Sequence, residues 1–267
     1  MLGHAAVAAW LLRFAYPRIS ADRRRALMRW WSGKLLRILG IGSRVQGAVP
    51  TATQHGTMIA ANHVSWLDIF LLSSVRPTRF IAKSEIRDWP AAGWIADKAG
   101  TIFIRRDQWR DTARINERVH DALEAGDCVG LFPEGITTEG DTLLKFHSAL
   151  FASSVANHAR VLPAAIRYEA RDGTLCREMS FAGDRSFMES LGVIIRQKAV
   201  VATVTFAEAI DTGGMTRREV SHAARERVAS LLGLETPGTP PGTAERRTAG
   251  DVAPPPFAMR RLGILRV

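Results

Sequence analysis

The stretch from residue 45 to residue 233 alternates short apolar runs with segments of helical periodicity. The apolar runs cover residues 57–61, 79–82, 101–104, 128–132, 160–166 and 199–206. Helical patterns are expected at residues 66–75, 90–98, 109–125, 146–157 and 216–232. Parallel strands need a crossover connection, which a helix supplies. The alternation therefore predicts an α/β domain with a mostly parallel twisted sheet flanked by helices.

The net charge of +10 is spread unevenly along the 267 residues. Residues 1–44 carry nine basic side chains and one acidic side chain, residues 234–267 carry five and three, and residues 45–233 carry 22 of each. We therefore expect a basic helical segment at 1–44, a neutral folded domain at 45–233, and a flexible Pro/Gly-rich tail at 234–267.

Residues 20–39 predict an amphipathic helix with Ser20 as its N-cap. Its apolar positions are Leu27, Trp30, Trp31, Leu35 and Ile38. Its polar side carries Arg24, Arg25, Arg29, Ser32 and Arg37. Such a helix either lies on an anionic membrane or packs its Trp face on the domain, and both can hold in part. An apolar stretch at 5–16 would complete a helical pair, separated from it by Pro17.

Several classes of function are disfavoured by what the sequence lacks. No apolar run reaches the roughly 18–20 residues of a transmembrane helix, so membrane contact is expected to be peripheral or monotopic. A nucleic-acid-binding surface would usually spread its charge over the folded domain, which is neutral here, so no nucleic-acid partner is expected. Cys128 and Cys176 form no CxxC or Cys/His cluster, which disfavours a metal site. GxGxxG, GxxxxGK[ST], GxSxG and HExxH patterns are also missing, and we expect no bound cofactor.

His63 and Asp68 lie five residues apart, directly after a strand-like run and at the start of a helical pattern. A carboxylate that accepts one imidazole N–H fixes the tautomer and stabilises the imidazolium, so the other ring nitrogen can take a proton from an alcohol. The competing interpretation is a structural histidine with a surface aspartate, because His-x4-Asp alone is a common spacing.

Three further blocks follow predicted strands. Arg105 and Arg106 end the run at 100–106, and paired guanidinium groups suit a phosphate, although a solvated strand end has the same pattern. Glu134 and Gly135 close the run Phe-Pro-Glu-Gly, which could equally be a turn. The run at 161–166 contains Pro163, which predicts an edge strand, a bulge or a close ligand approach.

The four blocks, in this order, resemble the glycerolipid acyltransferase family, typified by 1-acyl-glycerol-3-phosphate acyltransferases. The resemblance covers about residues 25–210 and comprises NHxSxxD at 62–68, GxxFIxR at 100–106, FPEG at 132–135 and the Pro-containing run at 161–166. It implies that His63 is the general base, that Asp68 orients it, and that the alkoxide attacks an acyl thioester directly. It also implies that Arg105 or Arg106 and the Glu134-Gly135 turn bind the polar head of the acceptor.

The same resemblance implies the substrates and the location. The donor would be acyl-CoA or acyl-carrier protein, and the acceptor a membrane lysolipid, with 1-acyl-glycerol-3-phosphate giving phosphatidic acid, at the cytoplasmic face of the membrane. Many phosphatidate-forming members continue FPEG with Thr-Arg, whereas this chain continues with Ile-Thr-Thr-Glu-Gly and has no basic residue before Lys145. This departure brings the sequence nearer to acyltransferases of lyso-ornithine lipid, which is the alternative acceptor. An alternative of another class is a non-enzymatic basic protein that binds membranes or nucleic acid.

Overall fold

The computed structural model describes residues 18–49, 56–84, 87, 96–97, 100–104 and 112–234. Contacts group Met1–Thr236 into one compact unit and Pro237–Val267 into a second, and all described residues belong to the first. The domain limits that the sequence predicts at residues 44 and 233 stay a prediction. The helix expected at 5–16 lies outside the described residues, and so does most of the helix expected at 90–98.

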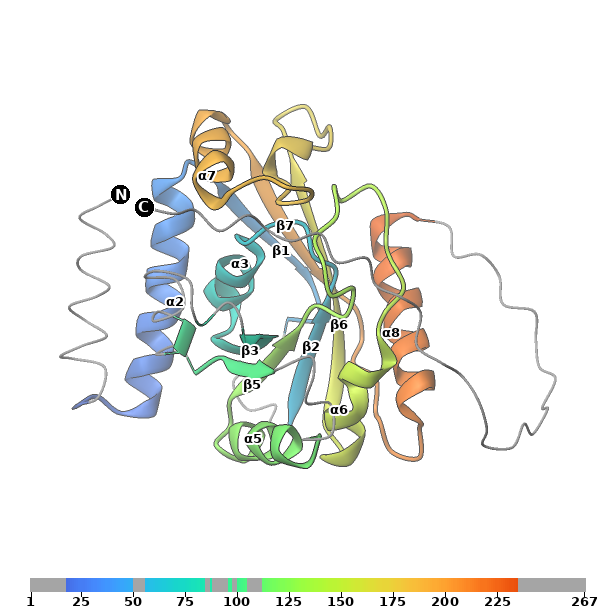
Figure 1. Cartoon of the computed structure of the whole chain (residues 1–267). Coiled ribbons are helices and arrows are strands. Elements are labelled where there is room, and N and C mark those ends of the chain that lie inside the picture. The colour runs from blue at the N-terminus through green and yellow to red at the C-terminus, as the bar shows by residue number, and fades with distance from the viewer. Residues whose placement is uncertain are drawn as a thin grey trace. The chain divides into compact units, whose positions relative to one another are not determined.

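A seven-stranded sheet forms the centre of this unit (Figure 1). Its strands are β1 (Gly42–Gly47), β2 (Thr57–Ala61), β3 (Thr78–Lys83), β4 (Ile102–Ile104), β5 (Cys128–Leu131), β6 (Arg160–Glu169) and β7 (Val201–Phe206). The spatial order is β1-β7-β6-β2-β5-β3-β4, and every pair is parallel except β6 with β7. The predicted α/β fold with a mostly parallel sheet is confirmed.

Helices cover both faces of the sheet. The α-helices are α2 (Ala21–Ile38), α3 (Asp68–Val75), α5 (Thr112–Glu124), α6 (Ala152–Ala156), α7 (Phe187–Arg196) and α8 (Arg217–Leu232). One apolar cluster joins α2, α3 and α7 to the sheet, and a second joins α5, α6 and α8 to it. Neighbouring residues of β2 alternate between them: Ile59 belongs to the first cluster and Met58 to the second. This two-sided burial explains why the central strands are continuous apolar runs.

The sequence patterns predict neither β1 nor α7, and they predict one helix that is longer than the structure has it. All six residues of β1 are exposed, so no apolar run marked it. The helix expected at 146–157 is a 3₁₀ turn at Ser148–Phe151 followed by the short helix α6. Pro163 lies in β6, an interior strand of the sheet, and not in an edge strand. The pairing of β6 with the chain of β7 shifts by one residue beside it, between the Ala164–Phe206 pair and the Val161–Ile210 bridge. That local bulge leaves room for a residue that has no N–H to donate.

Helix α2 packs on the domain with part of its predicted apolar face. Ser20 caps it as expected, and the Trp31 ring lies 5.6 Å from that of Phe70 in α3. Ser32, expected on the polar side, is buried together with Leu35 and Leu36, so the buried stripe is rotated from the predicted one. Trp30 remains 51% exposed. No described helix is both long and apolar enough to cross a bilayer.

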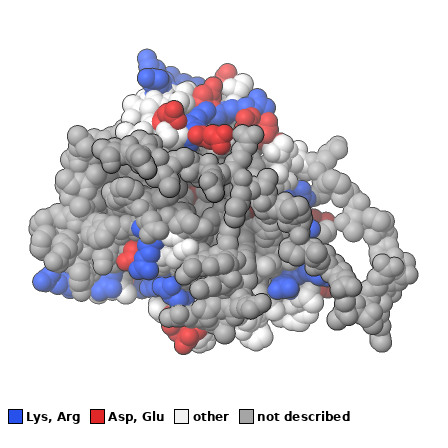
Figure 2. Space-filling model, viewed as in Figure 1, with Lys and Arg blue, Asp and Glu red and all other residues white. Residues whose placement is uncertain are grey.

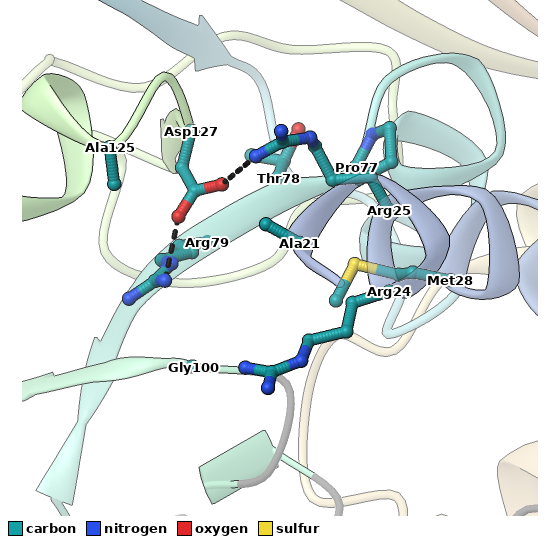
Figure 3. A pocket seen from close by; sticks show the side chains of 10 residues that line it. All are labelled: Ala21, Arg24, Arg25, Met28, Pro77, Thr78, Arg79, Gly100, Ala125 and Asp127. Carbon is teal, nitrogen blue, oxygen red and sulfur yellow. Dashed lines mark hydrogen bonds and ion pairs between the residues drawn. The ribbon is translucent and has the colours of Figure 1, made fainter. Parts of the chain in front are cut away.

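The N-terminal turns of α2 are tied to the sheet through one carboxylate. Asp127, just before β5, accepts from Arg25 of α2 at 3.1 Å and pairs with Arg79 of β3 at 2.6 Å (Figure 3). These groups and Arg24 line a cavity of about 220 Å³ at the start of β3. The pairing fixes α2 to the end of the sheet at which β3 and β5 begin.

Candidate active site

The first and third sequence blocks meet at the edge of the sheet formed by the carboxyl ends of its parallel strands. Residues 62–68 follow β2, and residues 132–135 follow its parallel neighbour β5. The carboxyl ends of parallel strands lie side by side, and this edge is where α/β domains usually bind ligands. The fold therefore brings His63, Asp68 and Glu134 together.

The His63 ring is held by Asp68 at the start of α3. Its Nδ1 lies 2.8 Å from Asp68 Oδ2, and the histidine side chain is 20% exposed while the aspartate is fully buried. Because the carboxylate oxygen accepts, Nδ1 carries the proton in this arrangement and Nε2 is left as the acceptor. The pair can therefore take a proton at Nε2 and share the resulting charge with Asp68.

Asp68 is fixed by more donors than the histidine alone. Its Oδ2 also accepts the backbone N–H groups of Val64 and Ser65, at 2.8 and 2.9 Å. Its Oδ1 accepts the hydroxyl of Tyr168 at 2.7 Å. Four donors and the N-terminus of α3 surround this buried carboxylate, which stabilises its negative charge and fixes its orientation.

Tyr168 is a functional candidate that sequence reasoning missed. It lies near the end of β6, is 1% exposed, and is separated from Asp68 by 100 residues, so no local pattern links the two. Burial, together with the neighbouring Asp68 charge, raises the pKa of Tyr168 well above its usual value. The hydroxyl thus stays protonated and donates to Asp68 over any ordinary assay range.

The Glu134 side chain contacts the backbone of His63. Its Oε1 accepts the His63 N–H and its Oε2 accepts the Leu144 N–H, both at 2.8 Å. Burial raises the pKa of this carboxyl, although the two backbone donors oppose the effect. The carboxylate ties the turn after β2 to the loop after β5. Its predicted contact with the acceptor stays a prediction.

A stack of aromatic rings supports the imidazole. The Phe132 ring lies 4.0 Å from the His63 ring and nearly parallel to it, and the Phe80 ring lies 5.5 Å from that of Phe132, also nearly parallel. Gly130 makes room for this stack, because a Cβ there would lie 2.8 Å from Phe80 and 2.6 Å from Thr78. The small residue in β5 therefore helps to set the plane of the catalytic candidate.

The turn at Gly135 needs a glycine for its backbone. Its φ of 76° lies in the left-handed region, and a Cβ would approach the ring of His147 to 3.4 Å. The His147 N–H donates to the Pro133 carbonyl at 2.8 Å, so the chain folds back on this turn. Gly135 thus shapes the loop beside His63, and its predicted contact with the acceptor stays a prediction.

The fourth block supports the site through the backbone. Asn62 donates to the Ile166 carbonyl at 3.0 Å and accepts from the Ile166 N–H at 2.7 Å, joining β2 to β6 where β2 ends. Arg105 and Arg106 lie outside the described residues, so their assignment as an anion clamp stays a prediction. Among the described residues, no His, Cys, Asp and Glu side chains cluster as a metal site would require.

Comparison with known proteins gives consistent matches. A family model described as "Acyltransferase" matches residues 42–167. The lyso-ornithine lipid O-acyltransferase of Pseudomonas aeruginosa is 38% identical over 91% of this chain and 92% of its own length. The 1-acyl-sn-glycerol-3-phosphate acyltransferase of Neisseria meningitidis is 40% identical over 69% of this chain and 71% of its own. The crystal structure of the 1-acyl-sn-glycerophosphate acyltransferase of Thermotoga maritima shares the fold, with a TM-score of 0.58 and 17% identity over 87% of this chain and 95% of that one.

Proposed function

The chain belongs to the acyltransferase family, and from that premise we propose that it moves a fatty acyl group from a thioester donor to the free hydroxyl of a lysolipid. The donor is acyl-CoA or acyl-carrier protein. The observation that carries this proposal is the buried Asp68 carboxylate, which holds Nδ1 of His63 and leaves Nε2 as a base beside the sheet edge. Relatives matched over two thirds or more of their length have names that specify lysolipid acceptors.

The arrangement supports direct transfer without an acyl-enzyme. His63 Nε2 takes the proton of the acceptor hydroxyl while its oxygen attacks the thioester carbonyl. The C–O bond forms, the C–S bond breaks, and the imidazolium returns the proton to the departing thiolate. Asp68 stabilises the imidazolium between these steps. Burial raises the pKa of both Cys128 and Cys176 to about 11, so neither thiol is suited to act as a covalent nucleophile at neutral pH.

The charges after Gly135 favour an acceptor whose headgroup carries an ammonium group. Glu139 follows Thr138, whose N–H donates to the His63 carbonyl at 2.8 Å. Glu139 and Asp141 both pair with Arg177, at 3.5 and 2.8 Å, so two carboxylates share one guanidinium. Net negative charge there attracts the ornithine ammonium and repels a phosphate dianion. Lyso-ornithine lipid is therefore the proposed acceptor. The alternative is 1-acyl-glycerol-3-phosphate, held through Arg105, Arg106, Glu134 and Gly135.

An assay with both acceptors side by side tests this choice. Purified full-length protein is given lyso-ornithine lipid or lysophosphatidic acid in matched micelles, with acyl-CoA and acyl-carrier protein as donors in separate arms. Faster transfer to lyso-ornithine lipid is expected. Faster transfer to lysophosphatidic acid would refute the acceptor assignment but not the transferase, whereas no transfer to either would refute both.

The enzyme works on the cytoplasmic face of the membrane, where its thioester donors are found, and it binds there peripherally through residues 1–44. Support comes from the exposed Trp30 of α2, which is flanked by Arg29, Lys34 and Arg37, all exposed. Deleting residues 1–44 would also remove the buried Leu36 and the first half of β1. A Trp30→Ser variant is therefore the better probe: weaker flotation with anionic liposomes is expected. Unchanged flotation, or DNA binding of equal strength at the same salt concentration, would contradict this role.

A further inference from the structure

The outer side of α7 presents an apolar ridge. Among the described residues, nine large hydrophobic side chains are exposed, and three of them belong to this ten-residue helix: Phe187, Met188 and Ile195. Leu191, which is partly buried and packs against the core, and Gly192 lie between them at helical spacing, and a Cβ on Gly192 would meet nothing within 4 Å. We call these five residues the α7 ridge. Met188 is 70% exposed, which is unusual for a side chain that gains free energy from burial.

Basic side chains flank the α7 ridge at both ends. Arg185 precedes the helix next to the exposed Asp184, and Arg196 and Lys198 lie at its end and just beyond it, so residues 184–198 carry three basic and two acidic side chains. The one acidic residue of the helix, Glu189, accepts from the backbone N–H and the hydroxyl of Ser186 as part of the N-terminal capping box. Figure 2 shows uncharged, basic and acidic surface side by side at the end of the molecule where Figure 1 places α7. An apolar stripe bordered by cations is complementary to an anionic bilayer surface.

The α7 ridge is coupled to the active site through Trp66. This residue follows His63 by three positions, its ring lies 5.0 Å from that of Phe187, and its Nε1 donates to Ser190 at 3.2 Å. The segment before α7 is also fixed to the site, because Phe181 donates to the Val64 carbonyl at 2.9 Å. A surface held by these contacts keeps a set orientation relative to the catalytic histidine.

We propose that the α7 ridge is a second lipid-contacting surface, which enters the headgroup region of an anionic bilayer and turns the His63 edge of the sheet toward it. This inference rests on the proposed lysolipid acceptor. With the ridge inserted, the acyl chain of the acceptor stays in the bilayer while its hydroxyl reaches Nε2. The segments that follow α2 and α7 lie side by side, because the Gly42 N–H donates to the Val200 carbonyl at 2.9 Å.

A double variant, Met188→Glu with Ile195→Glu, tests the ridge in the full-length protein. Both side chains are exposed, so folding is retained, and thermal unfolding verifies this. The control is Val45→Glu with Val49→Glu, which introduces the same charge at two other exposed aliphatic positions, in and after β1. Sedimentation with vesicles of phosphatidylcholine and phosphatidylglycerol is expected to show binding about tenfold weaker than wild type for the ridge variant only. Equal binding by wild type and both variants would overturn the proposal.

Transfer assays separate this inference from the proposed function. The ratio of transfer to a vesicle-embedded lysolipid over transfer to a short-chain monomeric one is expected to fall in the ridge variant and to stay constant in the control. An unchanged ratio would overturn the role of the ridge while leaving the transferase intact. Conversely, a wild-type protein that acylates no lysolipid refutes the proposed function, whatever the vesicles show. Conversion of a wild-type dimer to monomers by the ridge variant would identify a protein interface and also overturn the proposal.

Discussion

Replacing Tyr168 with phenylalanine removes one hydroxyl and leaves the ring that packs in the core. Oδ1 of Asp68 then loses its 2.7 Å donor, while Oδ2 keeps His63 and two backbone N–H groups. Both side chains are buried, so water does not readily replace the lost donor. The variant therefore changes how the negative charge on Asp68 is stabilised without touching the imidazole.

The expected loss of stability follows from that contact. A hydrogen bond to a charged group is worth about 1.5–3 kcal/mol, so unfolding should cost about 2 kcal/mol less. For a unit of this size that lowers Tm by about 4–8 °C. In catalysis, a carboxylate with one donor fewer holds the His63 imidazolium more strongly. The acid side of the pH profile of kcat therefore moves to higher pH, and kcat at neutral pH falls.

The assay is kcat against pH, with Tm measured on the same preparations. Thr212→Val is the matched control: it removes a buried hydroxyl that donates to the Ser154 and Ala159 carbonyls, away from the site. The control should lower Tm and leave the pH profile in place. If Tyr168→Phe lowers Tm but its pH profile coincides with wild type, Tyr168 only stabilises the fold, and the positioning role argued for it fails.

Two further variants probe the contacts that hold the backbone and the ring of His63. Burial raises the pKa of Glu134 in the folded state above its ordinary value of 4.5. The free energy of folding that this shift contributes is therefore fully present below pH 4.5 and is lost as the pH rises through the higher pKa of the folded state. In urea unfolding, the stability of wild type relative to Glu134→Gln should thus decline with rising pH across that window, and a constant difference would contradict the argument. Gly130→Ala would place a Cβ 2.8 Å from Phe80 and displace the stack on His63. It should cost about 1–3 kcal/mol of stability and lower kcat; unchanged kcat and Tm would show that the stack tolerates the methyl group.

The sequence predicted the central strands because each is buried on both faces and is therefore a continuous apolar run, as at β2. It did not predict β1, whose six exposed residues pair only along the edge of the sheet. Helix α7 carries a local sequence signal at its start, since Ser186 and Glu189, three residues apart, form a capping box.

In the candidate site, too, the sequence indicates contacts between nearby residues but not those that depend on the pairing of distant strands. His63 and Asp68 lie five residues apart, so their spacing allowed the 2.8 Å contact, although the same spacing also fitted a surface aspartate. The partners of Glu134 are backbone N–H groups, and a sequence pattern cannot say whether a carboxylate binds a substrate or the chain itself. Tyr168 reaches Asp68 only because β6 lies beside β2, a pairing set by the sheet and not by any nearby residue.

We propose that His63 is the base for direct acyl transfer to a lysolipid. The most direct test of this proposal is the rate of transfer from a labelled thioester to the lysolipid by His63→Ala, compared with wild type at equal vesicle binding and equal Tm. We expect a loss of about 10²–10⁴-fold, with no labelled acyl group retained on either protein. Transfer at the wild-type rate, or a covalent acyl-enzyme in either protein, would contradict it.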